Sequence, residues 1–492
     1  MGSTSKVEPI SSNAGWAIIR PATTMALNGH HPWVRFSDRS HLLRPNPPER
    51  SYGCAIVDAD GDGRPEILCG TVAGPNRLFK SQGRAWVDVA PAELADAGAS
   101  AIGVAAADAN GDGRMDFYIL NTSAFAGPNS EPDRLFINLG DGRYEDVMAR
   151  HPQRNLAAGR SVAWLDVLGD GQLSAYVCNY GAPNRLYFND GSGNWPDRAP
   201  HFGLHRVTGG RGLVCQDILG GDAMDIFCVN ENDANTFFRN TGGKFVETAA
   251  ELGLTDPETH GRGVAVIDAR GDGRAGLVYG NWEGPHRFMA WERRAKRFVD
   301  LATPDFAQPS RIRTVIVADF DNDGLDEIFM NNLGQTNRMF KVKEGGELLE
   351  CHIPEAEYPE GAGTGASVGD LDGDGFLDLF IAHGESAPQP NALLFGRPNG
   401  NHWLRIHPRT AAGAPAIGAK VTVTYDTPEG GRQRTRWIDG GSGYLCQMEP
   451  VAHFGLGPAT RIRDARVQFS TGEVHYLREL AADQNVEARA RA

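Results

Sequence analysis

Short apolar runs alternate with acidic, glycine-rich loops over most of the chain. Runs such as GCAIV at 53–57 and EILCG at 66–70 are too short for helices and are bounded by turn residues. Such runs are typical of strands. Helical periodicity is nearly absent, apart from one turn at 92–97. The pattern therefore predicts an all-β protein.

The acidic loops recur with a nearly constant period. Their first residues are Asp58, Asp108, Asp166, Asp217, Asp268, Asp319 and Asp370. Successive starts are 50, 58, 51, 51, 51 and 51 residues apart. Each repeat holds an apolar run, the loop, a second apolar run, an Asn-Arg-Leu-Phe-like run and a Phe/Trp-Val-Asp-like run. Four short strands per repeat are typical of propeller blades, so we predict a seven-bladed β-propeller.

The two ends of the repeat array differ from its middle. WVRFSDRS at 33–40 resembles the fourth run of a repeat, and the seventh repeat stops after its third run at 391–395. We expect the N-terminal strand to complete the last blade, which would leave no open edge. From residue 401 the pattern changes to alternating strands with turn glycines, which predicts a small β-sandwich-like domain. The predicted organisation is an extension at 1–30, the propeller at 31–400 and a tail domain at 401–492.

Four segments of the tail carry a family resemblance: GNHWLRI at 400–406, AIGAKVTV at 416–423, GSGYLCQ at 441–447 and HFGLG at 453–457. They resemble the ASPIC/UnbV domain of the cartilage acidic protein family, and the repeats resemble FG-GAP/VCBS propeller repeats. One departure is Phe469-Ser470-Thr471-Gly472, where the family usually shows Trp-Pro-Ser-Gly. The resemblance implies the architecture and no single activity.

Four of the acidic loops carry a full set of oxygen ligands for calcium. A DxDxDG loop supplies side-chain oxygens from positions 1, 3 and 5 and an acid at position 9, which are the hard ligands that calcium prefers. The residues are Asp58, Asp60, Asp62 and Glu66 in blade 1, Asp108, Asn110, Asp112 and Asp116 in blade 2, Asp319, Asp321, Asp323 and Glu327 in blade 6, and Asp370, Asp372, Asp374 and Asp378 in blade 7. We expect about four Ca²⁺ ions.

The loops of blades 3, 4 and 5 have lost ligands. Leu168, Leu219 and Arg270 replace the third ligand, and Ser174 and Gly276 weaken the ninth in two of these loops. An EF-hand is excluded because its bidentate Glu at position 12 is absent and strands flank the loops. The alternative for every loop is a tight acidic turn without metal.

A second repeated position precedes each loop by six residues. It reads Tyr52, Ile102, Arg160, Arg211, Arg262, Arg313 and Thr364. Six residues of strand span about 20 Å, so we expect the four arginines to line a funnel at the mouth opposite the acidic loops. Guanidinium groups suit carboxylate or phosphate. The alternative is that they pair with acidic residues of neighbouring blades.

A third repeated position follows the first Asp of each loop by thirteen residues. It reads Thr71, Asn121, Asn179, Asn230, Asn281, Asn332 and His383. We expect it at the same mouth, with Asn179, Asn230, Asn281 and Trp282 contacting a ligand beside the arginines. His260 and His383, with the four arginines, are the candidates for acid–base chemistry. The alternative for the asparagines is turn capping.

Charge and composition narrow the partners. The net charge of −14 and the absence of a basic run argue against nucleic acid. No stretch reaches transmembrane length, and residues 1–30 lack the apolar core of a secretory signal. This predicts an intracellular protein, or a secreted one if a leader was removed. The seven cysteines lie in apolar runs without CxxC pairs, which argues against a disulfide framework or a zinc site.

Two classes of function fit these features. The first is a calcium-stabilised propeller that binds an anionic small molecule or a protein partner at the funnel mouth. The alternative is an intracellular enzyme of lyase, isomerase or cyclase type that acts on a phosphate- or carboxylate-bearing substrate. HExxH, GxxxxGK and GxSxG signatures are absent. The ligand and the oligomeric state stay open.

Overall fold

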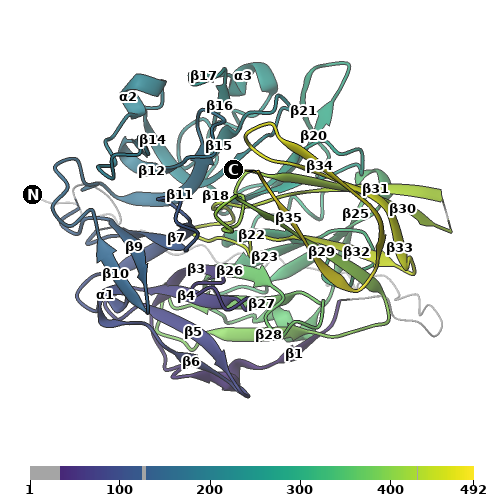
Figure 1. Ribbon diagram of the computed structural model, residues 1–492, viewed down its shortest axis with the longest axis horizontal. Coiled ribbons are helices and arrows are strands. Elements are labelled where there is room, and N and C mark those ends of the chain that lie inside the picture. Colours follow the sequence, from purple (N-terminus) through teal and green to yellow (C-terminus); the bar gives the residue numbers. More distant parts are fainter. Residues whose placement is uncertain (1–33, 125–128, 429, 492) are drawn as a thin grey trace, which may run out of the picture. The chain divides into compact units, whose positions relative to one another are not determined.

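In the part of the chain that the structure describes, six sheets surround a central axis, one of them a seven-stranded sheet that holds two blades, and two further sheets form the tail (Figure 1). This computed structural model describes residues 34–124, 129–428 and 430–491. The predicted extension at 1–30 lies outside the described residues. Residues Trp33–Ala492 form one compact unit. The protein is a seven-bladed β-propeller with a small β-sandwich-like tail, as the repeat pattern predicts.

The strands of blades 1 to 4 follow the repeat. Blade 1 holds β3 (Ser51–Val57), β4 (Glu66–Thr71), β5 (Arg77–Gln82) and β6 (Ala85–Asp88), with β2 (Leu43–Arg44) beside β6; blade 2 holds β7 (Ala101–Ala107), β8 (Asp116–Asn121), β9 (Arg134–Gly140) and β10 (Arg143–Asp146); blade 3 holds β11 (Gly159–Asp166), β12 (Leu173–Pro183) and β13 (Arg185–Tyr187); blade 4 holds β14 (Val207–Gln216), β15 (Asp225–Asn230), β16 (Thr236–Asn240) and β17 (Phe245–Glu247). The long β12 also pairs with β14, which joins blades 3 and 4.

Blades 5 to 7 complete the ring. Blade 5 holds β18 (Gly261–Ile267), β19 (Gly276–Asn281), β20 (Arg287–Glu292) and β21 (Arg297–Asp300); blade 6 holds β22 (Ile312–Ala318), β23 (Glu327–Asn332), β24 (Arg338–Val342) and β25 (Leu348–Cys351); blade 7 holds β26 (Gly363–Gly369), β27 (Asp378–His383) and β28 (Ala392–Gly396). The N-terminal β1 (Phe36–Asp38) is the outer strand of blade 7 and pairs antiparallel with β28. The first and last strands of the propeller therefore lie side by side.

The helices are single turns that connect strands. They are α1 (Ala92–Ala95), α2 (Ala199–Phe202), α3 (Ala249–Leu252) and α4 (Pro354–Glu357), with the 3₁₀ turns η1 (Ser40–Leu42) and η2 (Glu344–Gly346). Within the described ranges, none of these is long and apolar enough to cross a membrane.

The core lies between blades rather than at the axis. Because successive strand residues point to opposite faces, Trp164 of β11 packs toward blade 2 while Leu165 packs toward blade 4. Each pair of neighbouring blades shares one such apolar cluster among the described residues. The packing between neighbouring sheets therefore holds each inner strand at its distance from the central axis.

Glycines let the inner strands approach one another. Gly53, Gly212 and Gly365 directly follow Tyr52, Arg211 and Thr364 in the repeat. A Cβ at Gly212 would collide with the Arg262 carbonyl oxygen of the next inner strand. These positions therefore require the absence of a side chain, and the narrow channel depends on them.

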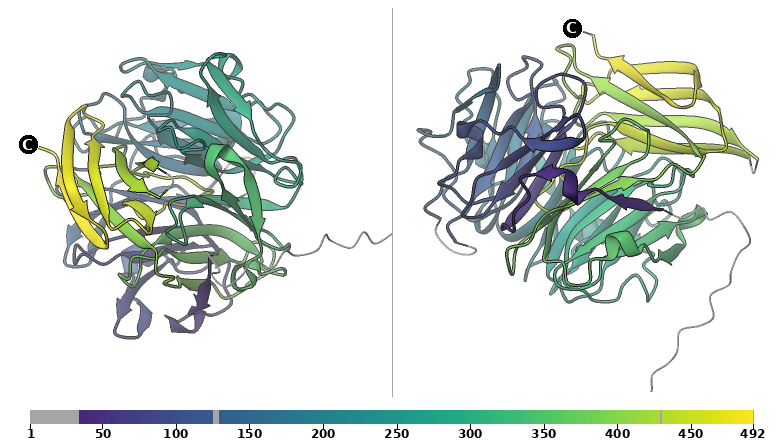
Figure 2. Two further views of the ribbon diagram at one scale, coloured as in Figure 1. Left: turned by 90° about the vertical axis from the view of Figure 1, so that its right-hand side faces the viewer. Right: turned by 90° about the horizontal axis from the view of Figure 1, so that it is seen from below.

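The tail packs on the acidic-loop end of the propeller. Its sheets are β32 (Ala452–Gly457), β29 (His402–Arg409) and β35 (Gln484–Arg489), and β31 (Gly430–Trp437), β30 (Lys420–Thr427), β33 (Arg461–Gln468) and β34 (Val474–Ala481). Lys420 bonds Asp217 of the blade 4 loop at 2.7 Å, and Ser470 donates to Asp166 of the blade 3 loop at 2.8 Å. Figure 2 shows the yellow tail strands stacked beside the ring. The tail thus caps one end of the channel.

Candidate functional site

In each acidic loop the first Asp accepts one or more hydrogen bonds from backbone amides of its own loop. In the intact blade 1 loop, Asp58 accepts hydrogen bonds from the amides of Gly61 (2.8 Å) and Gly63 (3.0 Å). The depleted blade 3 loop repeats the arrangement, with Asp166 accepting from Gly169 and Gly171 at 2.7 and 2.8 Å. The turn itself therefore does not depend on the ligands at positions 3 and 9.

The acid at position 9 also has a structural task. Glu66 accepts a hydrogen bond from the amide of Ala59, and Asp378 accepts one from the amide of Leu371, both at 2.8 Å. Burial raises the pKa of Glu66 to about 7, against the lowering effect of that amide. Each of these carboxylates therefore holds the backbone of the second loop residue in place.

Three loops bring carboxylate oxygens together as a metal site would require. The oxygens of three acids lie within 4.8 Å of one another in blades 1, 6 and 7: Asp58, Asp60 and Asp62; Asp319, Asp321 and Glu327; Asp370, Asp372 and Asp374. Oδ1 of the buried Asp319 has no hydrogen-bond partner among the described residues. Hard oxygens in this number suit calcium. In blade 2, position 3 of the loop is Asn110, whose Nδ2 donates a hydrogen bond to Asp112 (2.9 Å).

The blades differ in what lies among these oxygens. In blades 1 and 6 a lysine ammonium contacts the acids of positions 3, 5 and 9. In blade 7, Arg405 of the tail contacts one acid of the loop, Asp370, at 3.1 Å. The donor set fits a calcium ion in blade 7 without displacement of a side chain, and in blades 1 and 6 only if the lysine moves.

Four arginines converge on one cavity at the other end of the channel. The cavity measures about 140 Å³ and is lined by Tyr52, Ile102, Arg160, Arg211, Arg262, Arg313, Glu385, Tyr444 and Leu445. Arg160, Arg262 and Arg313 lie at the starts of β11, β18 and β22 and Arg211 lies within β14, whereas the acidic loops follow the ends of the same strands. The repeat therefore places guanidinium groups and acidic loops at opposite ends.

Two glutamates are bonded to three of these arginines. Glu231 accepts from Arg211 Nε at 2.8 Å and from Arg262 Nη2 at 2.6 Å, and Glu385 pairs with Arg313. Burial favours the neutral form of Glu231, but the two guanidinium groups outweigh it and lower its pKa to about 2. Part of the pairing with neighbouring acids, which the sequence left as an alternative, is thus present. Among the described residues, four guanidinium groups and these two carboxylates lie at the cavity.

Two aromatic rings support the arginines. The guanidinium carbon of Arg211 lies 4.5 Å from the Tyr180 ring centre, and that of Arg313 lies 4.0 Å from the Trp282 ring centre. Tyr180, Glu231 and Trp282 occupy one position of the repeat, directly after the Asn. In each case the residue contacts the arginine of the following blade. This pairing was readable from the repeat, because both positions recur every 51 residues there.

A loop of the tail reaches this cavity through the channel. Gly440 accepts from the amide of Trp164 (2.8 Å), and Ser442 and Cys446 pair with each other. Tyr444 lies at the turn between them and forms part of the cavity wall. Burial favours its neutral phenol, but Arg211, Arg262, Arg313 and Arg160 outweigh burial and lower its pKa. Sequence analysis missed this residue, which lies far along the chain from the blades.

The asparagines of the third repeated position cap turns. Nδ2 of Asn179, Asn230 and Asn281 donates to the carbonyl oxygens of Pro183, Ala234 and Pro285, at 2.7, 2.6 and 2.7 Å. All three are buried and do not line the arginine cavity. This is the turn-capping arrangement that was the alternative to ligand contact.

The two candidate histidines lie outside the cavity lining. Nδ1 of His383 donates to the Pro390 carbonyl oxygen (3.0 Å), and burial lowers the pKa of His383. His260 forms a bridge with Glu231 through its backbone. The structure brings together the four arginines and Trp282 but leaves both histidines at strand ends.

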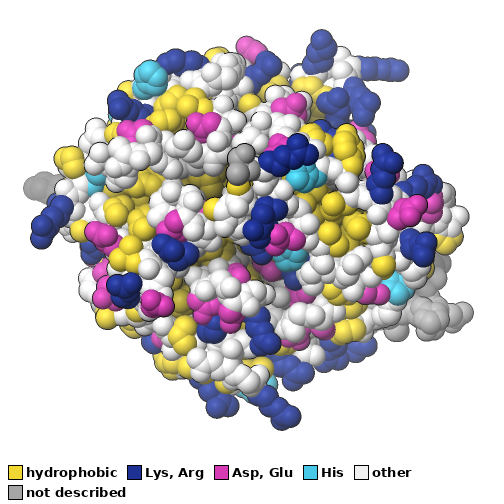
Figure 3. All heavy atoms as spheres, viewed as in Figure 1, with side chains coloured by type: hydrophobic (Ala, Val, Ile, Leu, Met, Phe, Trp, Pro, Cys, Tyr) yellow, Lys and Arg dark blue, Asp and Glu magenta, His cyan; other side chains and the backbone are white. Residues whose placement is uncertain are grey.

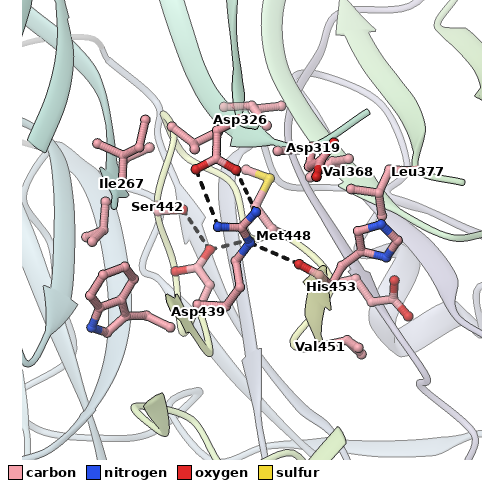
Figure 4. A pocket seen from close by; sticks show the side chains of 18 of the residues that line it. Ile267, Asp319, Asp326, Val368, Leu377, Asp439, Ser442, Met448, Val451 and His453 are labelled. Carbon is pink, nitrogen blue, oxygen red and sulfur yellow. Dashed lines mark hydrogen bonds and ion pairs between the residues drawn. The ribbon is translucent and has the colours of Figure 1, made fainter. Parts of the chain in front are cut away.

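A second cavity of about 120 Å³ lies where the tail meets the propeller (Figure 4). Arg436 of β31 reaches Asp326 of the blade 6 loop at 2.6 Å and donates to the His453 carbonyl at 2.9 Å. Asp439 accepts from the Ser442 hydroxyl at 2.6 Å. Of these contacts, the Arg436–Asp326 pair joins the tail to the propeller.

Charge on the visible surface is mixed. On the face in Figure 3, Lys and Arg side chains are interspersed with Asp and Glu, without a continuous basic stripe.

Comparison with known proteins places the architecture. A family model described as ASPIC and UnbV matches residues 409–492, and one described as FG-GAP-like repeat matches residues 58–119. A solved structure, the BP39L lectin from Burkholderia pseudomallei, aligns with a TM-score of 0.50 at 14% identity over 72% of this chain and 97% of the lectin, a likeness of fold alone. The class is thus an FG-GAP-type β-propeller with an ASPIC/UnbV tail.

Two relatives define the family. Cartilage acidic protein 1 of Homo sapiens is 45% identical over 452 residues, which span 84% of this chain and 68% of that protein. The Mus musculus protein of the same name is 44% identical over 452 residues, which span 84% of this chain and 69% of that protein. The chain belongs to the cartilage acidic protein 1 family.

Proposed function

We propose that this protein is a calcium-stabilised propeller that binds an anionic small molecule, or an anionic group of a partner, in the arginine cavity. One observation carries the proposal: Arg160, Arg211, Arg262 and Arg313 converge on a single cavity with more guanidinium groups than carboxylates. Buried charges are costly unless they are paired. An anion in the cavity would offset the excess positive charge.

The lining of the cavity favours a carboxylate, phosphate or sulfate group. Guanidinium groups bind such planar or tetrahedral oxyanions through two parallel hydrogen bonds. Arg262 and Arg313 are 6% exposed, so each is held in place before a ligand arrives. Stacking on Trp282 restricts both side chains further. A site with fixed donors loses little entropy on binding.

Crystals soaked separately in phosphate, sulfate and succinate test the proposal. We expect electron density for at least one anion within hydrogen-bond distance of two or more of the four guanidinium groups. The Arg262→Gln protein, soaked under the same conditions, should lose that density. An empty cavity with all three anions would contradict the proposal.

The alternative function is an enzyme of lyase, isomerase or cyclase type acting on the same anionic substrate class. The observation that favours it is Tyr444, whose lowered pKa suits a general base. In this case Tyr444→Phe would retain anion binding and lose turnover. A protein that binds but turns over none of the anions tested would act as a binding protein.

Calcium is proposed to stabilise the loops, as the donor sets suggest. Removal of calcium with a chelator should lower the melting temperature, because an ion that binds only the folded state stabilises it. Addition of excess calcium, but not of magnesium, should restore it. An unchanged melting temperature after chelation would remove calcium from the proposal.

A further inference from the structure

Two lysines occupy the centres of acidic loops that otherwise have full calcium ligand sets. Lys341 of β24 lies 2.7 Å from Asp321, 2.8 Å from Asp323 and 2.8 Å from Glu327. Its side chain is 8% exposed. One ammonium group therefore contacts the acids of positions 3, 5 and 9 of the blade 6 loop together.

The blade 1 loop repeats this arrangement. Lys80 of β5 lies 2.7 Å from Asp62 and 3.2 Å from Glu66, and it also pairs with Asp60. Lys80 and Lys341 occupy the same position of the repeat, four residues after the Asn of the third strand. Two independent blades thus place the same cation on the same three carboxylates.

The two remaining intact loops have no cation at this position. The equivalent residues are Ile137 in blade 2 and Phe395 in blade 7. Arg114 reaches Asp112 in blade 2 and Arg405 reaches Asp370 in blade 7, but each contacts only one acid of its loop. The four intact loops therefore divide into two with a central lysine and two without; of the latter two, the blade 7 loop brings three carboxylates within 4.8 Å of one another.

We propose that Lys80 and Lys341 are built-in cations that take the place of calcium in blades 1 and 6, so that calcium binds only in blades 2 and 7. The expected number of ions rests on the proposed function, in which calcium stabilises the loops. It revises the expectation of about four ions from sequence.

The chemistry of the two cations explains why they exclude each other. An ammonium group has three donors, and Lys341 lies within ion-pair distance of three carboxylates and donates a hydrogen bond to one of them, Asp321. Calcium would need the same oxygens at about 2.3–2.6 Å. Both cations cannot share one cage, since like charges repel strongly where little water screens them. For calcium to enter blade 6, Lys341 would have to leave a buried position and its three partners.

Counting bound calcium tests the inference. Equilibrium dialysis against calcium ions, followed by elemental analysis, should give two ions per wild-type chain. Lys80→Met and Lys341→Met should each raise the count to three, and the double variant to four. Lys343→Met, which removes a nearby exposed lysine paired with Glu347, should leave it at two. Asp374→Asn in blade 7 should lower it to one.

The outcomes separate the inference from the proposal beneath it. Four ions in the wild type, or lysine variants that stay folded and gain none, would overturn the inference and leave calcium stabilisation intact. No calcium in the wild type, with one ion gained per lysine variant, would support the exclusion of calcium by Lys80 and Lys341 and would overturn calcium binding in blades 2 and 7 together with calcium stabilisation. If Lys341→Met folds only with added calcium, that dependence supports the inference, and the more exposed Lys80 supplies the stoichiometric test.

Discussion

Gly443 of the tail and Val264 of the blade 5 inner strand exchange two backbone hydrogen bonds, of 2.9 and 2.7 Å. Similar contacts join Leu445 to Val104 and Gln447 to Cys54. The tail loop therefore pairs with inner strands on several sides of the channel. Since these strands also form the inter-blade contacts, we expect propeller and tail to unfold as one cooperative unit.

Gln447 is the residue that tests this cooperativity. Its buried side chain accepts from the Ala106 amide at 2.5 Å and donates to the Ala106 carbonyl at 3.0 Å. Gln447→Met would leave both backbone groups unpaired, at a cost of about 1–3 kcal/mol each. Calorimetry should show one transition, shifted as a whole to lower temperature. Two transitions, of which only one moves, would show that the tail unfolds independently.

Gly212 tests the close approach of the inner strands. Gly212→Ala places a methyl group against the Arg262 carbonyl oxygen, which is backbone and has little freedom to move. Overpacking of this kind typically costs about 1–3 kcal/mol. Gly98→Ala is the matched control, because nothing lies within 4 Å of a Cβ there. Urea unfolding should show a loss for Gly212→Ala only; equal stabilities would contradict the packing described.

Asp133 predicts a pH dependence of stability. It is buried in blade 2 at the position that is Asn76 in blade 1 and Asn337 in blade 6. Burial raises the pKa of Asp133 to about 7, despite hydrogen bonds from Asn155, the Asn121 amide and Tyr118. The unfolded chain releases this proton near pH 4. The folded state thus holds more protons between about pH 4 and 7, and the free energy of unfolding falls as the pH rises through that window.

Asp133→Asn removes this titration and introduces the residue that blades 1 and 6 carry at this position. Relative to wild type, the variant should gain stability steadily from about pH 4 to pH 7, as measured by denaturant unfolding at several pH values. The exposed Asp141→Asn serves as control and should follow the wild-type profile. A constant difference between Asp133→Asn and wild type across this range would show that Asp133 stays charged in the folded state.

Tyr444 should differ from the other tyrosines in its titration. The pKa of Tyr444 is lowered by four arginines, whereas burial raises the pKa of Tyr118 and Tyr279. In a pH titration followed by the near-ultraviolet absorbance of phenolate, one component should therefore appear at a pH below the normal range for tyrosine. Tyr444→Phe should lack this component. Tyr425→Phe, which removes another tyrosine of the tail, should retain it. If Tyr444→Phe keeps this component, the lowered pKa of Tyr444 is contradicted.

The propeller was predictable because its signal is local and repeated. The loop that begins at Asp58 and its six counterparts each indicate a strand, a turn and a second strand within about twenty residues. The number of repeats then gives the number of blades. The arginines were placed correctly at one mouth because strand length fixes the distance from Arg211 to Asp217. The asparagines were harder, because a strand-end amide can reach either a ligand or its own turn, and Asn230 reaches its turn.

The features that sequence did not reveal involve contacts between distant parts of the chain. Nothing near Tyr444 indicates that it enters a channel formed by the blades, which lie earlier in the chain. Lys80 looks like an ordinary surface lysine until β5 is folded back beside its own loop. The repeat did contain one unused clue, the lysine shared by blades 1 and 6 at the same position.

Anion binding at the arginine cavity is tested most directly by calorimetric titration of phosphate, sulfate and succinate into the full chain. The account predicts that at least one anion binds and that Arg211→Gln weakens it by about tenfold to a hundredfold, as loss of one charged hydrogen bond requires. The exposed Arg463→Gln, which removes a tail arginine paired with Asp426, should bind like the wild type. Equal affinities in all three proteins would contradict the account.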